Sequence, residues 1–145
     1  MRHCIAWLLI LGWLGSLPLS AQELIDWRTL AEVAFVQERD PLGGYPVTRP
    51  VFGPPVQALA GDTIEIQGYV LPVDTEGKQY VLSAFPYASC FFCGGAGRES
   101  VIELELQPGH RRFAQDEYLR FRGVLALREA EYDLIYRLER AEVRE

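Results

Sequence analysis

The sequence predicts an all-β protein, a small five-stranded antiparallel barrel preceded by an N-terminal helix and a proline-rich strap. From Asp62 onward, apolar and polar residues alternate with a period of two in five short runs, which is typical of strands that bury one face. Five strands are too few for a two-sheet sandwich, but they suit a sheet that closes on itself. Gly68 and Gly123 lie inside two of these runs, where a missing side chain permits the bend that closure requires.

The beginning of the chain has the composition of a secretory signal peptide. A basic start at Arg2 precedes an apolar run over residues 5–15, and small residues come just before Gln22. The uncharged stretch, residues 4–19, is shorter than the roughly 20 residues that cross a bilayer comfortably, which favours cleavage over a membrane anchor. We therefore expect residues 1–21 to be removed and the protein to be periplasmic.

The remaining chain has the composition of one acidic domain. Removing residues 1–21 takes away one basic residue, Arg2, and no acidic one, so the formal charge of −6 becomes −7. A surface of that sign repels phosphate backbones, so we expect no nucleic-acid partner. Residues 22–61 are expected to form the helix and the strap, and residues 62–145 the barrel.

Residues 22–40 are predicted to form a helix. Asp26 can cap it, because its carboxylate can accept hydrogen bonds from the first N–H groups. Apolar residues then recur at helical spacing, namely Trp27, Leu30, Val33 and Ala34. The stretch 41–44, which contains one proline and two glycines, ends the segment. Prolines in residues 45–58 remove N–H donors from helices and ladders, so this part is predicted to be an extended strap across the domain.

The alternating runs place the strands of the barrel. They cover residues 64–70, 78–86, 102–106, 119–125 and 134–138. A barrel of the oligonucleotide/oligosaccharide-binding (OB) type fits this number of strands best. The longest gap without strand character runs from Tyr87 to Ser100 and holds two cysteines.

Cys90 and Cys93 are the only cysteines after residue 21. Three glycines follow the pair within four residues, so the loop can fold back and bring both sulfur atoms to one spot. One interpretation is a structural disulfide, which an oxidising compartment favours. The loop that it would close is very short, so its stabilising effect would be only about 2 kcal/mol.

A second interpretation of the pair is a metal site. Two thiolates at this spacing supply half of a tetrahedral zinc site, since zinc binds anionic sulfur at about 2.3 Å. His110 is the only histidine of the remaining chain and a candidate ligand, although a solvated loop histidine is the plainer interpretation of it. A carboxylate such as Asp74 or Glu99, or the same pair from a second subunit in a homodimer, could also complete the site.

A third interpretation is thiol–disulfide exchange. Such enzymes place the first cysteine at a helix N-terminus, which lowers its pKa, whereas here glycines follow the pair and no helical pattern does. Attachment of a c-type haem is excluded, because Gly94 stands where that motif needs a histidine. The aromatic residues of this stretch are expected to plug a barrel end rather than form an exposed docking patch: Phe85, Tyr87, Phe91 and Phe92.

Several short motifs resemble a bacterial family catalogued as domain of unknown function 3299. The resemblance runs from about Trp27 to Ala141. Its motifs are Pro50-x-Phe52, Leu59-x-Gly61, Gly68-Tyr69-Val70-Leu71-Pro72, Cys90-Phe91-Phe92-Cys93-Gly94 and Gly97-x-Glu99-Ser100. Arg98 stands where the family more often has proline. The resemblance implies a small periplasmic protein with no established enzymatic activity, encoded in several members beside export-type transporter subunits in zinc-responsive gene clusters.

Together these inferences predict an exported binding or accessory protein that works with membrane transport components. It would handle zinc through Cys90 and Cys93, with His110 as a further candidate ligand. The alternatives are a thiol–disulfide redox protein that uses the same pair and an interaction module with a structural disulfide. The sequence indicates no catalytic residues.

Overall fold

The computed structural model describes residues 24–129 and 133–144, so the predicted signal peptide lies outside the described residues. The chain begins with the one-turn helix α1 (Trp27–Leu30), the strands β1 (Val33–Arg39) and β2 (Pro46–Phe52), and the short helix α2 (Pro54–Ala58). The strands β3 (Thr63–Pro72), β4 (Tyr80–Ser83), β5 (Val101–Leu106), β6 (Glu117–Leu127) and β7 (Tyr136–Arg144) follow. Three 3₁₀ turns separate β4 from β5, namely η1 (Tyr87–Ser89), η2 (Phe91–Cys93) and η3 (Arg98–Ser100). Among the described residues, none of the helices has the length and apolar character that a membrane span needs.

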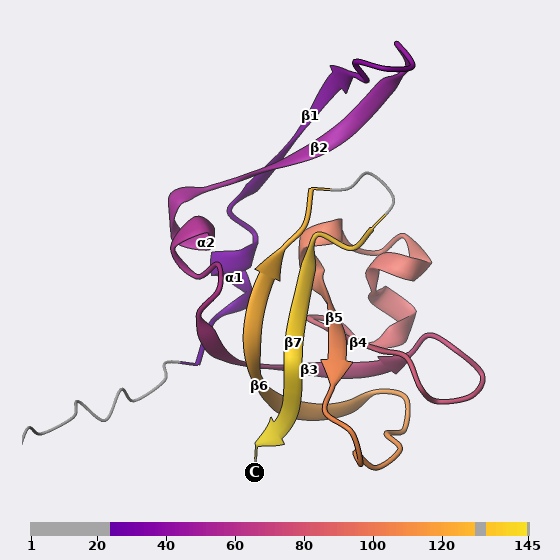
Figure 1. The fold of residues 1–145 in the computed structure, drawn as a ribbon. Helices are drawn as coiled ribbons and strands as arrows, with labels where there is room; N and C mark the ends of the chain where they lie inside the picture. The colour runs from indigo at the N-terminus through magenta and orange to yellow at the C-terminus, as the bar shows by residue number, and fades with distance from the viewer. Residues whose placement is uncertain (1–23, 130–132, 145) are drawn as a thin grey trace, which may run out of the picture.

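The five strands β3 to β7 close into a barrel in the order β3-β4-β5-β7-β6, with β6 pairing back onto β3 (Figure 1). The predicted all-β fold and its five-stranded OB-like barrel are confirmed. One detail of the prediction was wrong, because β5 and β7 pair in parallel while the other neighbours are antiparallel. A closed ring with an odd number of strands cannot alternate direction all the way round. At least one neighbouring pair must therefore be parallel.

The two mid-strand glycines lie where the barrel wall bends. β3 pairs with β6 along most of its length and with β4 from Tyr69 onward, so Gly68 precedes the point where the second partner joins. A Cβ atom on Gly68 would lie 2.5 Å from the carbonyl oxygen of Ser83. Gly123 lies at a register shift between β6 and β7, where a Cβ would come within 2.7 Å of the Glu139 carbonyl oxygen. Both positions therefore require a residue without a side chain, as the sequence predicted.

The interior of the barrel and the N-terminal helices share one hydrophobic core. Leu30 of α1, Phe52 of β2 and Val56 of α2 pack in the same cluster as the inward residues of the barrel strands. Tyr136, which is fully buried, donates a hydrogen bond of 2.6 Å from its hydroxyl to the carbonyl oxygen of Leu30. Phe113, from the connection between β5 and β6, packs edge-on against Tyr80 in this core.

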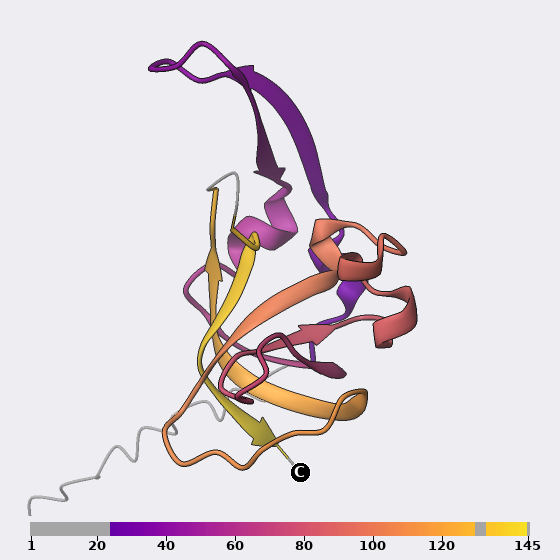
Figure 2. The same cartoon turned by 90° about the vertical axis from the view of Figure 1, so that its right-hand side faces the viewer.

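The segment before the barrel differs from its prediction. Asp26 does cap a helix, since its carboxylate accepts a 3.0 Å hydrogen bond from the Arg28 N–H, but the helix ends at Leu30 instead of continuing to residue 40. The remainder of the predicted helix forms β1, and the predicted strap forms β2 and α2. β1 and β2 make an antiparallel hairpin that stands away from the barrel (Figures 1 and 2). The β-branched and aromatic residues of β1 favour a strand once β2 supplies a partner.

An ion pair joins the connection between β5 and β6 to the first residue of β6. Arg111 donates two hydrogen bonds to the carboxylate of Glu117, at 3.1 and 2.6 Å, and the Ala114 N–H donates a third. The Arg111 hydrogen bonds, followed by the one from Ala114, lower the pKa of Glu117 to about 2. A carboxylate with a lowered pKa stabilises the fold above its unfolded pKa and loses this effect as pH falls through the folded one.

We therefore expect Glu117→Gln to lower the free energy of unfolding at pH 7 by about 1 kcal/mol, a modest value because the Arg111 side chain is largely exposed. The difference from wild type should shrink as pH falls from about 4.5 to about 2. Urea unfolding at several pH values measures the difference in the free energy of unfolding between the two proteins. Glu76→Gln is the control, because the Glu76–Lys78 pair is mostly exposed and contributes little. A difference between wild type and Glu117→Gln that stays constant down to pH 2 would contradict the assignment.

Candidate functional site

The cysteine pair lies in a loop that main-chain hydrogen bonds hold in shape. The N–H groups of Cys93 and Gly95 both donate to the carbonyl oxygen of Cys90, at 3.2 and 3.1 Å. Gly94 ends η2 in the left-handed region at φ 75°, a conformation that favours glycine. Gly95 has no room for a side chain, since a Cβ would lie 2.6 Å from the Ser89 carbonyl oxygen. The glycines after the pair therefore fold the loop back on itself, as the sequence predicted.

The thiols of the two cysteines are near enough to influence each other, but they have different environments. Cys90 is fully buried on the outer wall of the barrel, in a small cluster with Leu71, Val81 and Leu134. Cys93 is exposed, and both residues are free thiols. Partial desolvation raises the pKa of the Cys93 thiol, and the charge and hydrogen bond of the adjacent Cys90 raise it further. The loop thus presents one accessible and one buried sulfur side by side.

This arrangement does not suit an attacking thiol. A thiolate is the nucleophile in thiol–disulfide exchange, and a raised pKa keeps Cys93 protonated at neutral pH. Cys90, which would be the first cysteine of an exchange motif, is the buried one. It precedes η2, which spans only three residues and has too few aligned peptide groups for a substantial dipole. The pair is chemically better suited to forming a disulfide or to binding a thiophilic ion after losing its protons.

The structure does not bring His110 to the cysteine pair. The His110 ring packs against the rings of both Tyr80 and Phe113, and its Nδ1 lies 2.8 Å from the Arg111 carbonyl oxygen. Within residues 24–129 and 133–144, no three or more histidine, cysteine, aspartate or glutamate side chains form a group that could hold a metal ion. Asp74 is engaged elsewhere, since its carboxylate accepts hydrogen bonds from the N–H groups of a turn between β3 and β4. Cys90 and Cys93 therefore stand as two sulfur donors without a local third ligand in the described chain.

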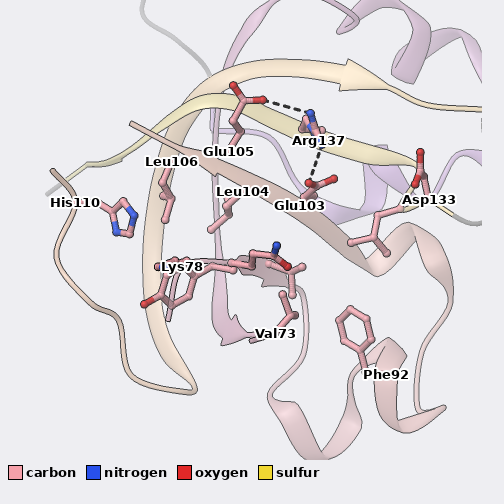
Figure 3. A pocket seen from close by; sticks show the side chains of 14 residues that line it. Val73, Lys78, Phe92, Glu103, Leu104, Glu105, Leu106, His110, Asp133 and Arg137 are labelled. Atoms are coloured by element: carbon pink, nitrogen blue, oxygen red, sulfur yellow. Dashed lines mark hydrogen bonds and ion pairs between the residues drawn. The ribbon is translucent and has the colours of Figure 1, made fainter. Parts of the chain in front are cut away.

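A surface groove of about 650 Å³ lies between the cysteine loop and His110 (Figure 3). Its floor is the outer face of β4 and β5, and the β3–β4 turn and the segment before β7 form its sides. Phe92 and His110 lie at opposite ends of it. The second and third strands of an OB barrel, with the loops beside them, form the face on which such barrels commonly bind ligands. The groove therefore lies at the usual binding face of this fold.

Charged side chains on the groove floor neutralise one another. Arg137 donates to Glu103 at 2.8 Å and to Glu105 at 3.4 Å (Figure 3). Glu103 also accepts a 2.6 Å hydrogen bond from Arg128, which in turn pairs with Asp133. Arg128 and Arg137 are therefore both paired with carboxylates. Sequence reasoning missed the groove because its residues come from several separate segments between Val73 and Arg137, and only the outward positions of alternating strands could have indicated it.

Three of the four aromatic residues that were expected to plug a barrel end are exposed, and the fourth, Phe91, is partly exposed. Phe85, Tyr87 and Phe92 have exposed fractions of 45%, 46% and 49%. The barrel core is filled by the inward residues of the strands together with Phe113, Leu30 of α1 and Val56 of α2. The aromatic residues therefore surround the cysteine loop on the protein surface.

Comparisons of the chain with protein-family models, with curated proteins and with solved structures found no match. The resemblance to the family catalogued as domain of unknown function 3299 therefore stays a prediction.

Proposed function

We propose that the protein is an exported periplasmic binding protein that takes up zinc, or another thiophilic ion, through Cys90 and Cys93, as an accessory of a membrane transport system. The observation that supports the proposal best is the loop itself, in which main-chain hydrogen bonds to the Cys90 carbonyl oxygen hold the two neighbouring thiols in place. Soft anionic sulfur is the ligand that such ions prefer. The choice of zinc and the link to transport come from the family resemblance.

The cysteine pair supplies only two of the four ligands that zinc usually has, and this limits the expected affinity for zinc. Zinc in proteins is usually held by four ligands, and the described residues supply two sulfur atoms without a third nearby donor. Water, a partner protein or the same pair of a second chain would fill the other positions. An ion held in this way binds weakly to one chain and is easily passed on, which suits an accessory of transport.

Protonation should compete with the ion. Because the pKa of Cys93 is raised, the thiol carries its proton at neutral pH and must lose it on binding. The affinity for zinc should therefore rise with pH between 6 and 8, by up to about tenfold per pH unit for each proton released.

Zinc titration of the reduced chain lacking residues 1–21 tests the proposal. Calorimetry and native mass spectrometry should show uptake by wild type, between about half an ion and one ion per chain, and none by Cys90→Ser/Cys93→Ser. His110→Ala is the matched control and should bind as wild type does, because its ring lies away from the pair. Equal uptake by wild type and the double serine variant would rule out the cysteine pair as the site.

A second candidate is an interaction module whose loop carries a Cys90–Cys93 disulfide. The burial of Cys90 beside Cys93 favours it, since a buried sulfur in an apolar cluster is poorly placed to meet an ion. The intact mass of protein isolated from the periplasm, with and without alkylation of thiols, separates the two states. A fully oxidised pair would favour the disulfide, because oxidised sulfurs do not bind zinc as thiolates do.

A further inference from the structure

The hairpin of β1 and β2 is a two-stranded sheet whose base packs on the barrel core through Val33 and Phe52, and the Arg98 guanidinium lies 5.5 Å from the centre of the Phe35 ring. Both ribbon views show its outer part leaving the barrel, with its tip far from β3 to β7 (Figures 1 and 2). Within the described parts of the chain, β1 pairs only with β2. A hairpin with only two strands is marginally stable in water, so a third strand would stabilise it.

The hydrogen bonds of the hairpin fix which main-chain groups face outward. The Asp40 N–H donates to the Tyr45 carbonyl oxygen at 2.9 Å, and the Gly53 N–H donates to the Glu32 carbonyl oxygen at 2.7 Å. In an antiparallel pair these bonds recur at every second residue. The even-numbered residues of β1 therefore bond to β2. The N–H and C=O groups of Phe35, Gln37 and Arg39 point away from it.

The two edges of the hairpin are not equivalent. The same alternation turns the even-numbered residues of β2 outward, and two of these are Pro46 and Pro50. Proline has no N–H, so this edge cannot continue a regular ladder, and such prolines are a common protection of edge strands. The outward residues of β1 include no proline. Only the β1 edge is therefore open to a further strand.

We infer that the free edge of β1 pairs with β1 of a second copy of this chain, antiparallel and centred on Gln37. In this register Gln37 lies opposite its own copy, and Phe35 lies opposite Arg39 of the partner subunit. Both pairs join outward residues, which can exchange both main-chain hydrogen bonds. The result is a four-stranded sheet with proline-protected outer edges.

Two properties favour this register over its neighbours. They are the charges of the side chains that face each other and the main-chain N–H groups that can donate to a second strand. Glu38 lies opposite the partner's Val36, so no carboxylate faces another. Arg39 lies opposite the partner's Phe35, a residue whose ring already has Arg98 of its own chain at 5.5 Å. Centring the pair on Glu38 would place two carboxylates face to face, which is unfavourable. Centring it on Val36 would require the N–H of Val33, which already donates to the Ala31 carbonyl oxygen at 2.8 Å. A strand that avoids like-charge contacts with its own copy favours the second copy as occupant over an unrelated peptide.

The test is the oligomeric state of the chain lacking residues 1–21, in EDTA, by sedimentation equilibrium. Wild type should dimerise with rising concentration. Gln37→Pro removes an outward N–H at the centre of the pairing and should weaken dimerisation roughly tenfold or more. Thr48→Pro is the matched control, because the Thr48 N–H points to the edge that Pro46 and Pro50 already interrupt. It should dimerise as wild type does.

Two results would overturn the inference, namely a wild type that stays monomeric and a Gln37→Pro variant that dimerises as wild type does.

Hydrogen exchange of wild type gives a readout that does not depend on the variant folding. The amides of Phe35, Gln37 and Arg39 should gain protection as concentration rises, and unchanged exchange counts against the pairing. The Cys90→Ser/Cys93→Ser variant should dimerise without metal. A dimer that needs both zinc and the cysteines supports the shared metal site and overturns the β1 pairing.

Discussion

Gly68→Ala is expected to lower the free energy of unfolding by about 3 kcal/mol, near the upper end of the usual cost of overpacking. The added Cβ would lie 2.5 Å from the Ser83 carbonyl oxygen and 3.1 Å from Cγ of Leu82. The first of these atoms belongs to the backbone of β4, which cannot move without disturbing its pairing with β3. Urea denaturation followed by tryptophan fluorescence measures the change.

Gln67→Ala is the matched control for Gly68→Ala. Gln67 is the neighbouring residue of β3 on the outward, partly exposed side of the strand, so its truncation should change stability by about 0.5 kcal/mol or less. A loss of similar size in both variants would mean that the cost arises from strand propensity and not from the close approach of β3 and β4.

Tyr136→Ala is expected to cost about 4 kcal/mol, and Tyr136→Phe about 1–3 kcal/mol. The whole residue is buried, and its ring packs 5.7 Å from that of Phe52. Alanine leaves a cavity between the barrel and the N-terminal segment. Phenylalanine removes only the hydroxyl and leaves the Leu30 carbonyl oxygen without its 2.6 Å hydrogen bond. Chemical denaturation of both variants measures these losses.

Tyr118→Phe controls for the removal of a tyrosine hydroxyl. Tyr118 is 54% exposed, so water can replace any contact of its hydroxyl and stability should stay nearly constant. A Tyr136→Phe variant as stable as wild type would show that the bond to Leu30 contributes nothing net to folding. Hydrogen exchange in α1 adds a local readout, since loosening of the N-terminal segment should expose its amides first.

The barrel could be predicted from sequence because each strand has one face in the core. Ile64 and Ile66 are buried while Glu65 and Gln67 are partly exposed, and this local contrast is visible in the sequence as alternation. Which strands are neighbours depends on contacts far apart in the chain. The odd number of strands in a closed barrel implies at least one parallel pair. That β5 and β7 form this pair could not be predicted without knowing the order of the strands.

The hairpin was missed for a different physical reason. Helical spacing of apolar residues around Val33 predicted one long helix, but β1 has a partner strand that the prolines of β2 concealed. Pro46 and Pro50 are compatible with a strand only because their missing N–H groups face outward. That condition depends on register, which the sequence alone does not reveal.

The candidate site was predicted in part. The glycines after Cys93 correctly indicated a loop that folds back and brings the two sulfur atoms together. The place of His110 could not be deduced, because the connection between β5 and β6 turns its ring toward Tyr80 and Phe113 instead of the cysteines. Local sequence thus predicted local geometry, whereas the number of ligands depends on how distant loops pack.

The position of β7 sets the order in which the molecule can fold. This last strand lies between β5 and β6, and its first residue bonds to Leu30, 106 positions earlier in the chain. A nascent chain can form the β3–β4 hairpin early, but the ring stays open, with unpaired edges on β5 and β6, until the C-terminal residues arrive. Such high contact order predicts slow folding, on the scale of milliseconds to seconds. The barrel can therefore close only after the residues of β7 have been synthesised.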